Sequence, residues 1–185
     1  FKKLNKMNVG DFYVINISCP NSFGGQPFSR PSAYEKLVKE LSKVKSSKPI
    51  LIKLSPDLTK KNIDKIISIS LKYGVSGFIC SNLTKKHNFG KGGLSGKAVE
   101  RASDELVSYV YSKTRGKLVL IAVGGIFTAE DAYRKITLGA NLVEIITGMI
   151  YRGPNVISEI NQGICQILRK EGYRNISEAV GTLAK

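Results

Sequence analysis

The chain has 185 residues, of which 42% are hydrophobic and 23% are charged, and its formal net charge is +15. These values are typical of a globular domain with a buried core, and no apolar run approaches the roughly 20 residues that cross a bilayer. The 29 Lys and Arg residues are spread along predicted helix faces, which favours a solvated basic surface over a nucleic-acid site.

The three cysteines and the single histidine argue against a metal site, a disulfide framework and a histidine-based catalytic relay. Cys19, Cys80 and Cys165 have no spacing typical of a metal site, and their odd number predicts no disulfide framework. His87 lies in a predicted loop beside two lysines, so we expect it to be solvated and not part of a catalytic relay. The chain begins at Phe1 without an apolar signal segment or a Met, and we expect residues upstream of it.

Apolar strands and amphipathic helices alternate along the chain. Strands are predicted near residues 12–17, 50–54, 77–81, 118–123 and 142–146. Helices are predicted near residues 32–45, 59–73, 98–114, 129–138 and 154–170. Several strands are apolar on both faces, which indicates a buried parallel sheet. The alternation is compatible with a (β/α)8 barrel or a doubly wound open sheet.

The first predicted strand ends in Asn16-Ile17-Ser18-Cys19-Pro20-Asn21, which places two amides, a hydroxyl and a thiol together. An amide can bind a planar polar ligand through a donor and an acceptor at once. A deprotonated thiol can act as a base or a nucleophile. The alternative interpretation is a turn with a buried, inert cysteine.

The ends of the other strands favour the barrel. Each predicted strand finishes in polar or glycine residues, which are Asn16, Lys53, Ser81-Asn82, Gly124-Gly125 and Thr147-Gly148 in chain order. A doubly wound sheet binds its ligand at one switch point. Five successive strand ends with polar or glycine residues are instead typical of a barrel whose strands surround one pocket. No Gly-x-Gly-x-x-Gly follows the first strand. Because such a barrel has eight strands, we expect residues 1–185 to be its C-terminal portion, about the last five βα units.

Two of these ends predict an anion site. Gly124 and Gly125 precede Thr128 and Asp131, whose spacing resembles a capping box with a helix that begins at Ala129. In barrels the loops after strands seven and eight often bind phosphate, and the alternative is a pair of tight turns. Lys53 could balance an anionic ligand or a developing negative charge, or could simply extend from the rim into water.

The ordered set of motifs resembles the dihydroorotate dehydrogenases, most closely the quinone-linked class 2. The matching stretches extend to about Leu168 and are Asn-Ile-Ser-Cys-Pro-Asn at 16–21, Ile-Lys-Leu-Ser-Pro-Asp-Leu at 52–58, Gly-Gly-Leu-Ser-Gly at 92–96, Val-Gly-Gly-Ile at 123–126, and the segment from Thr147-Gly148 to Gly153-Pro154. The resemblance implies an FMN-binding (β/α)8 barrel, a flavoprotein oxidoreductase that oxidises dihydroorotate to orotate in pyrimidine biosynthesis. In that family a base removes a proton from C5 while C6 delivers hydride to the flavin.

The resemblance also implies a role for each matching residue. Cys19 would be the base, and residues 22–30 would form a mobile loop over the substrate. The implied substrate-binding residues are Asn16, Asn21, Asn82 and Leu83. The implied FMN-binding residues are Asn16, Lys53, Ser81, Gly96, Gly124, Gly125, Ile146, Thr147 and Gly148.

Three positions depart from the family pattern. Quinone-linked members usually carry Ser where Cys19 stands, and Cys is typical of the soluble class 1. Leu83 stands where a Thr usually contacts substrate, and Ile146 replaces a common Tyr. The electron acceptor is therefore open between quinone, which the class favours, and fumarate or NAD. We expect a location on the cytoplasmic side, with peripheral contact to the inner membrane as one option.

Two other functions stay open from the sequence. One is another flavin barrel that acts on a pyrimidine, of the dihydropyrimidine or tRNA dihydrouridine type, for which the +15 charge would suit RNA. The other is a non-catalytic, truncated half-barrel. We expect the chain alone to be inactive, because the upstream units of the family carry further site residues.

Overall fold

The computed structural model describes residues 1–19 and 27–184. Its centre is one parallel sheet of five strands, in which the spatial order follows the chain order. The strands are β1 (Tyr13–Asn16), β2 (Ile50–Leu54), β3 (Gly77–Cys80), β4 (Val119–Val123) and β5 (Leu142–Glu144). A doubly wound sheet reverses its order at a switch point, and no such reversal occurs in the described part of the chain. The order confirms the barrel-type winding.

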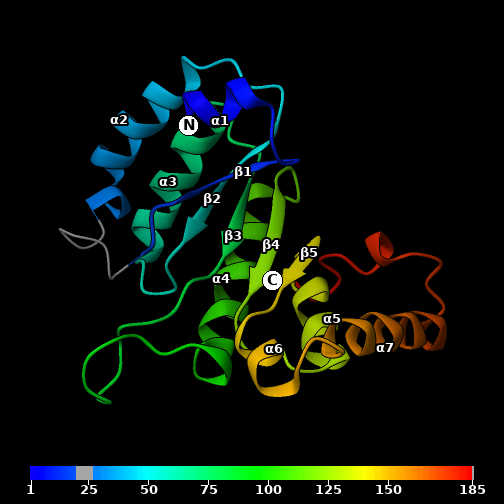
Figure 1. The fold of residues 1–185 in the computed structure, drawn as a ribbon. Helices are drawn as coiled ribbons and strands as arrows, with labels where there is room; N and C mark the ends of the chain where they lie inside the picture. Colours follow the sequence, from blue (N-terminus) through cyan, green and yellow to red (C-terminus); the bar gives the residue numbers. More distant parts are fainter. Residues whose placement is uncertain (20–26, 185) are drawn as a thin grey trace.

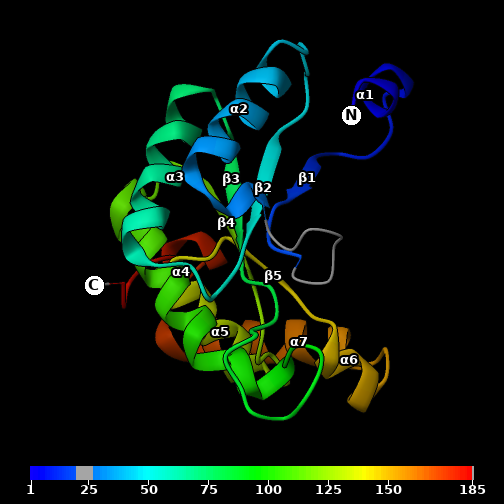
Figure 2. The ribbon, with the colours of Figure 1, turned by 90° about the vertical axis from the view of Figure 1, so that its left-hand side faces the viewer.

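Each strand is connected to the next by a segment that contains a helix, and these helices lie along one face of the sheet (Figures 1 and 2). In the turned view of Figure 2, the first three of them stand side by side against the strands. The crossover helices are α2 (Pro31–Ser42), α3 (Lys60–Lys72), α4 (Glu100–Thr114) and α5 (Ala129–Thr137), and α7 (Val156–Glu171) packs on α5.

The two faces of the sheet differ in how they are covered. Side chains such as Ile52, Phe78 and Leu120 point to the helix-covered face and form the main core with the buried faces of the helices. Alternate residues form a small second cluster of Leu51, Ile79, Ile121 and Val123. Successive strand residues point to opposite faces, so this second cluster belongs to the inner face of the curved sheet.

Local signals set the ends of two helices as the sequence predicts. The Thr59 side chain accepts a hydrogen bond from the backbone N–H of Asn62 at the start of α3. At the start of α5, Thr128 and Asp131 form a capping box in which each side chain bonds the backbone of the other. A capped helix starts at a defined residue, because the first N–H groups have no partner within the helix.

Two helices lie outside the predictions. The short helix α1 (Lys2–Met7) precedes the first strand, and α6 (Thr147–Arg152) begins directly after β5. The sequence predicts a phosphate-binding loop at Thr147-Gly148, with a tight turn as the alternative, and in the structure these two residues begin a helical segment that ends before Gly153. Three short 3-10 turns complete the described elements: η1 (Pro27–Ser29), η2 (Gly96–Val99) and η3 (Ile176–Glu178).

Candidate functional site

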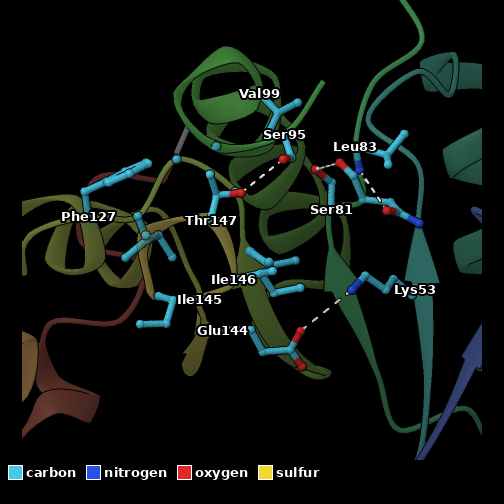
Figure 3. A pocket seen from close by; sticks show the side chains of 17 residues that line it. Lys53, Ser81, Leu83, Ser95, Val99, Phe127, Glu144, Ile145, Ile146 and Thr147 are labelled. Atoms are coloured by element: carbon cyan, nitrogen blue, oxygen red, sulfur yellow. Dashed lines mark hydrogen bonds and ion pairs between the residues drawn. The ribbon is translucent and has the colours of Figure 1, made fainter. Parts of the chain in front are cut away.

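A cavity of about 210 Å³ lies at the carboxyl ends of β2 to β5. Its volume equals that of several water molecules at roughly 30 Å³ each, so it is larger than a packing defect. The lining residues come from strand ends and from the loops that follow (Figure 3), and they are Lys53, Ser81–Leu83, Ser95, Gly96, Val99, Val123–Phe127 and Glu144–Gly148. In parallel α/β folds this end of the sheet is where ligands bind.

Strand register brings the polar side chains of the inner face together. Asn16 on β1 lies beside Lys53 on β2, and Val123 on β4 lies beside Glu144 on β5. The sheet curves strongly enough that Lys53 Nζ is 3.9 Å from Glu144 Oε2 although two strands separate them. These side chains point toward each other across the cavity (Figure 3).

Four glycines line one wall of the cavity, and a Cβ at any of them would lie less than 3.0 Å from a neighbouring atom. Gly125 has a φ of +79°, and a Cβ there would lie 2.4 Å from the Cβ of Glu100. Gly96 has a φ of +67°, and its Cβ would lie 2.8 Å from Cγ2 of Thr147. Ser95 and Thr147 meet through a hydroxyl–hydroxyl hydrogen bond of 3.0 Å. Backbone N–H groups and small hydroxyls are therefore the groups that this wall offers to an anion.

An ion-pair network behind the glycines joins the loops that carry them. Lys97, next to Gly96, lies 2.7 Å from Asp131 Oδ1 and 2.8 Å from Glu100 Oε2. The other oxygen of Asp131 accepts hydrogen bonds from the backbone N–H groups of Phe127 and Thr128. Burial alone would raise the pKa of Asp131, but Lys97 and these N–H groups outweigh burial and hold the pKa below its ordinary value. The ionised Asp131 therefore connects the loop that carries Gly96 to the loop that precedes α5.

A single serine connects the two amides that were predicted to bind substrate. Ser18 is fully buried, and both its backbone N–H and its hydroxyl donate to Oδ1 of Asn16, at 3.1 and 2.8 Å. The amide nitrogen of Asn82 donates to the same hydroxyl at 3.0 Å. Oδ1 of Asn82 in turn accepts from the backbone N–H of Leu83 at 2.8 Å. The side chains at the ends of β1 and β3 thus form one hydrogen-bonded unit.

Most of the predicted site residues share one cavity, but not all of them. Those that line it are Lys53, Ser81, Asn82, Leu83, Gly96, Gly124, Gly125, Ile146, Thr147 and Gly148. Asn16 and the partly exposed Cys19 do not line it, although Asn16 is the last residue of β1 and Cys19 lies three residues after it. Asn21 and residues 22–26 of the expected mobile loop lie outside the described residues. His87 is not among the lining residues.

Two residues of the site were not singled out from the sequence. Ser18 was one hydroxyl in a polar loop, and nothing in its local pattern marked it as a bridge. Glu144 ends β5, and the sequence offered only an acidic residue in an apolar run as a signal. Its role becomes visible through strand register, since the inner face is defined only after the strands are paired.

The donor set suits a phosphorylated, planar ligand such as FMN. A Cβ at Gly96, Gly124 or Gly125 would collide with Thr147, Val99 or Glu100, respectively, so these positions offer backbone groups and no side chain to a ligand. Lys53 supplies a positive charge at the other side of the cavity. The described residues include no group of three or more His, Cys, Asp or Glu that could hold a metal ion. Within the same residues, no helix is long and apolar enough to cross a membrane.

Fold and cavity together define a parallel α/β protein of the barrel type, with a ligand site at the carboxyl ends of its strands. A family model described as dihydroorotate dehydrogenase matches residues 1–168. The chain therefore belongs to the dihydroorotate dehydrogenase family.

Curated relatives carry the quinone-linked name. A "dihydroorotate dehydrogenase (quinone)" from Trichodesmium erythraeum is 39% identical over 194 residues, which cover 96% of this chain and 51% of the relative. One from Crocosphaera subtropica is 41% identical over 187 residues, which cover 92% of this chain and 49% of the relative. The resemblance to class 2 is thereby confirmed. The chain spans about half the length of these relatives.

Solved structures give the same family. A ligand-free DHODH from Eimeria tenella superimposes with a TM-score of 0.89 at 30% identity, covering 100% of this chain and 58% of that one. A DHODH from the same organism in complex with ferulenol gives a TM-score of 0.88 at 29% identity, covering 98% of this chain and 55% of that one. The predicted fold class is confirmed for the portion that the chain spans.

Proposed function

We propose that this chain forms the FMN-binding, C-terminal portion of a barrel that oxidises dihydroorotate to orotate in pyrimidine biosynthesis. The observation that carries the proposal is the cavity itself. It joins a glycine and hydroxyl wall suited to phosphate with Lys53 on the opposite side, in a chain of the dihydroorotate dehydrogenase family. In this proposal residues 1–185 are the C-terminal portion of a single (β/α)8 barrel, and the chain alone is inactive.

FMN would be held along the wall described above. The backbone of Gly96, Gly124, Gly125 and the Ile146–Gly148 segment would bind its phosphate, so the replacement of a common Tyr by Ile146 costs no backbone contact. When bound, FMN would supply the acceptor for the substrate hydride. Lys53 would oppose negative charge that develops at the flavin ring.

Substrate would be held by amides and activated by a thiol. Asn16, Asn21 and Asn82 would bind the polar edges of the pyrimidine, and the hydrogen bonds through Ser18 fix the orientation of Asn16 and Asn82 before it arrives. Leu83 supplies no side-chain donor to substrate. Cys19 would accept the C5 proton as a general base.

Quinone is the acceptor that we favour, because the relatives that the chain resembles are named as quinone-linked. Such an acceptor is apolar, and we propose peripheral contact of the whole protein with the inner membrane on its cytoplasmic side. Cys19 alone points the other way, since cysteine at this position is typical of the soluble class that uses fumarate or NAD.

The decisive experiment measures flavin reduction by substrate. Because the chain spans about half of its relatives, the remainder of the Trichodesmium erythraeum protein is fused to it to supply the rest of the barrel. Anaerobic dihydroorotate should bleach the bound flavin, and Cys19→Ala should slow bleaching by about 10²–10⁴-fold, the usual contribution of a general base. The FMN dissociation constant should stay unchanged in the variant.

Two results would count against this function. Full-rate bleaching in Cys19→Ala would show that another group takes the proton. A folded chimera that binds no flavin, or whose flavin is not reduced by dihydroorotate, would remove the proposed reaction. Cys19→Ser serves as the matched variant, because the quinone-linked pattern carries Ser there, and we expect it to retain part of the rate.

A further inference from the structure

Lys53 does not face the cavity alone. Of the 17 described residues that line it, only Lys53 and Glu144 carry a charge. Their side chains are 17% and 35% exposed, respectively, and the ammonium nitrogen is 3.9 Å from the nearer carboxylate oxygen. Among the described residues Glu144 forms no other ion pair. The cavity therefore carries one positive and one negative charge, which cancel in net.

The position of Glu144 gives its charge a direct effect on any ligand. It is the last residue of β5 and stands two residues before Ile146 and three before Thr147. This segment lines the glycine and hydroxyl wall of the cavity. An ion pair this long and partly open to water is weak, so neither partner is locked to the other. An anionic ligand would thus be attracted by Lys53 and repelled by Glu144.

We propose that Glu144 sets the electrostatic strength of the flavin site by partly neutralising Lys53, a role that rests on the proposed FMN function. Glu144 acts through Lys53 and through the field in the cavity. It lowers the affinity for the phosphate dianion of FMN and for the additional negative charge of reduced flavin. A neutral side chain of the same shape removes that repulsion and leaves the ammonium unopposed.

The test compares ligands of different charge on the full chain. Glu144→Gln keeps the side-chain shape, and Glu35→Gln is the matched control, because Glu35 loses the same charge in an exposed pair with Lys72 on the outer helices. Dissociation constants are measured by fluorescence titration with FMN and with riboflavin, which lacks the phosphate. Two unit charges roughly 10 Å apart at an effective dielectric constant of about 20 correspond to a change on the order of tenfold.

We expect Glu144→Gln to bind FMN about tenfold more tightly than the unmodified chain and riboflavin within about twofold of it, while Glu35→Gln changes neither. Anaerobic titration with reduced FMN should show a further gain of about tenfold over oxidised FMN, equivalent to a rise of about 30 mV in the two-electron midpoint potential. Raised salt should diminish both gains.

The outcomes separate the two proposals. If the unmodified chain binds FMN and Glu144→Gln has the same FMN-to-riboflavin affinity ratio as Glu35→Gln, the role of Glu144 is overturned and the flavin site stands. Equal gains for FMN and riboflavin would also overturn it, since they would reflect packing and not charge. If neither the chain nor its chimera binds FMN, the flavin site itself fails, and this role fails with it.

Discussion

Residue environment separates the cysteines of this chain more clearly than their sequence neighbours do. Cys80, on the helix-covered face of β3, is fully buried in the main core, whereas Cys165 on α7 is exposed. Burial raises the pKa of the Cys80 thiol to about 12, against a smaller opposing effect of the nearby Lys135 ammonium. Cys80 is therefore an apolar core residue in its chemistry.

This difference predicts selective alkylation. At pH 8 a thiol with a pKa of about 12 is ionised in only about one molecule in 10⁴. Iodoacetamide should therefore modify Cys165 in the folded chain and reach Cys80 only after unfolding in denaturant. Peptide mass spectrometry identifies the sites, and Cys165→Ser is the control. Equal rates at Cys80 and Cys165 in the folded chain would contradict the buried assignment.

At the scale of elements, the start of α5 combines two functions in one residue. Asp131 completes the capping box with Thr128 and also pairs with Lys97 next to Gly96. One carboxylate thus connects the start of α5 to the glycine and hydroxyl wall of the cavity. A substitution that weakens the cap should therefore also loosen that wall.

Asp131→Asn should lower the free energy of unfolding by about 1–2 kcal/mol, because it weakens a cap and removes the charge that pairs with the half-exposed Lys97. Glu105→Gln is the control, since it removes the same charge from an exposed pair with Arg101. The folded-state pKa of Asp131 lies below its ordinary value. Its stabilisation is therefore present above the ordinary pKa of about 3.9 and is lost as the pH falls through the lowered value.

Chemical denaturation from pH 7 to pH 3 tests both statements. The gap between the original chain and Asp131→Asn should be constant near neutrality and shrink in the acid range. A gap that is independent of pH throughout would indicate that the ionised carboxylate contributes nothing.

The elements could be predicted largely from the sequence, and the site only in part. Periodicity records which face of a helix or strand is buried, so the five strands, the main helices and the caps at Thr59 and Thr128 followed from local pattern. α1 and α6 are too short to show a period. Two features of the site depend on contacts between strands that are far apart in the chain: the hydrogen bonds through Ser18 and the ion pair of Lys53 with Glu144. Such contacts cannot be predicted from the residues next to each of these positions in the sequence.

At the scale of the molecule, the described part of the sheet is bordered by β1 and β5, and some apolar residues of its inner face are exposed to water. Val14, Val119 and Leu142 are 40%, 42% and 56% exposed. Register places Val14 beside Leu51 and Leu142 beside Ile121, both of the inner face, and Val119 beside Gly77. Among the described strands β1 and β5 are the edge strands, and exposed apolar residues on or beside an edge strand favour association with further strands.

We therefore expect the chain by itself to self-associate as its concentration rises, as measured by sedimentation velocity. Leu142→Gln combined with Val119→Thr should weaken this association. Leu71→Gln is the matched control, because Leu71 is 51% exposed on α3, away from the inner face. A chain that stays monomeric at all accessible concentrations, or a control that acts as strongly as the double variant, would contradict the expectation.

The strand order has a consequence for how the molecule is made. Each strand from β2 to β5 pairs with its immediate predecessor in the chain, so each new βα unit can pair with the unit synthesised just before it. Each of these pairings joins two strands that are separated by one crossover segment with its helix, and N-terminal parts emerge first from the ribosome. The sheet can thus grow strand by strand during translation, and the cavity would take shape last, when β5 brings Glu144 opposite Lys53.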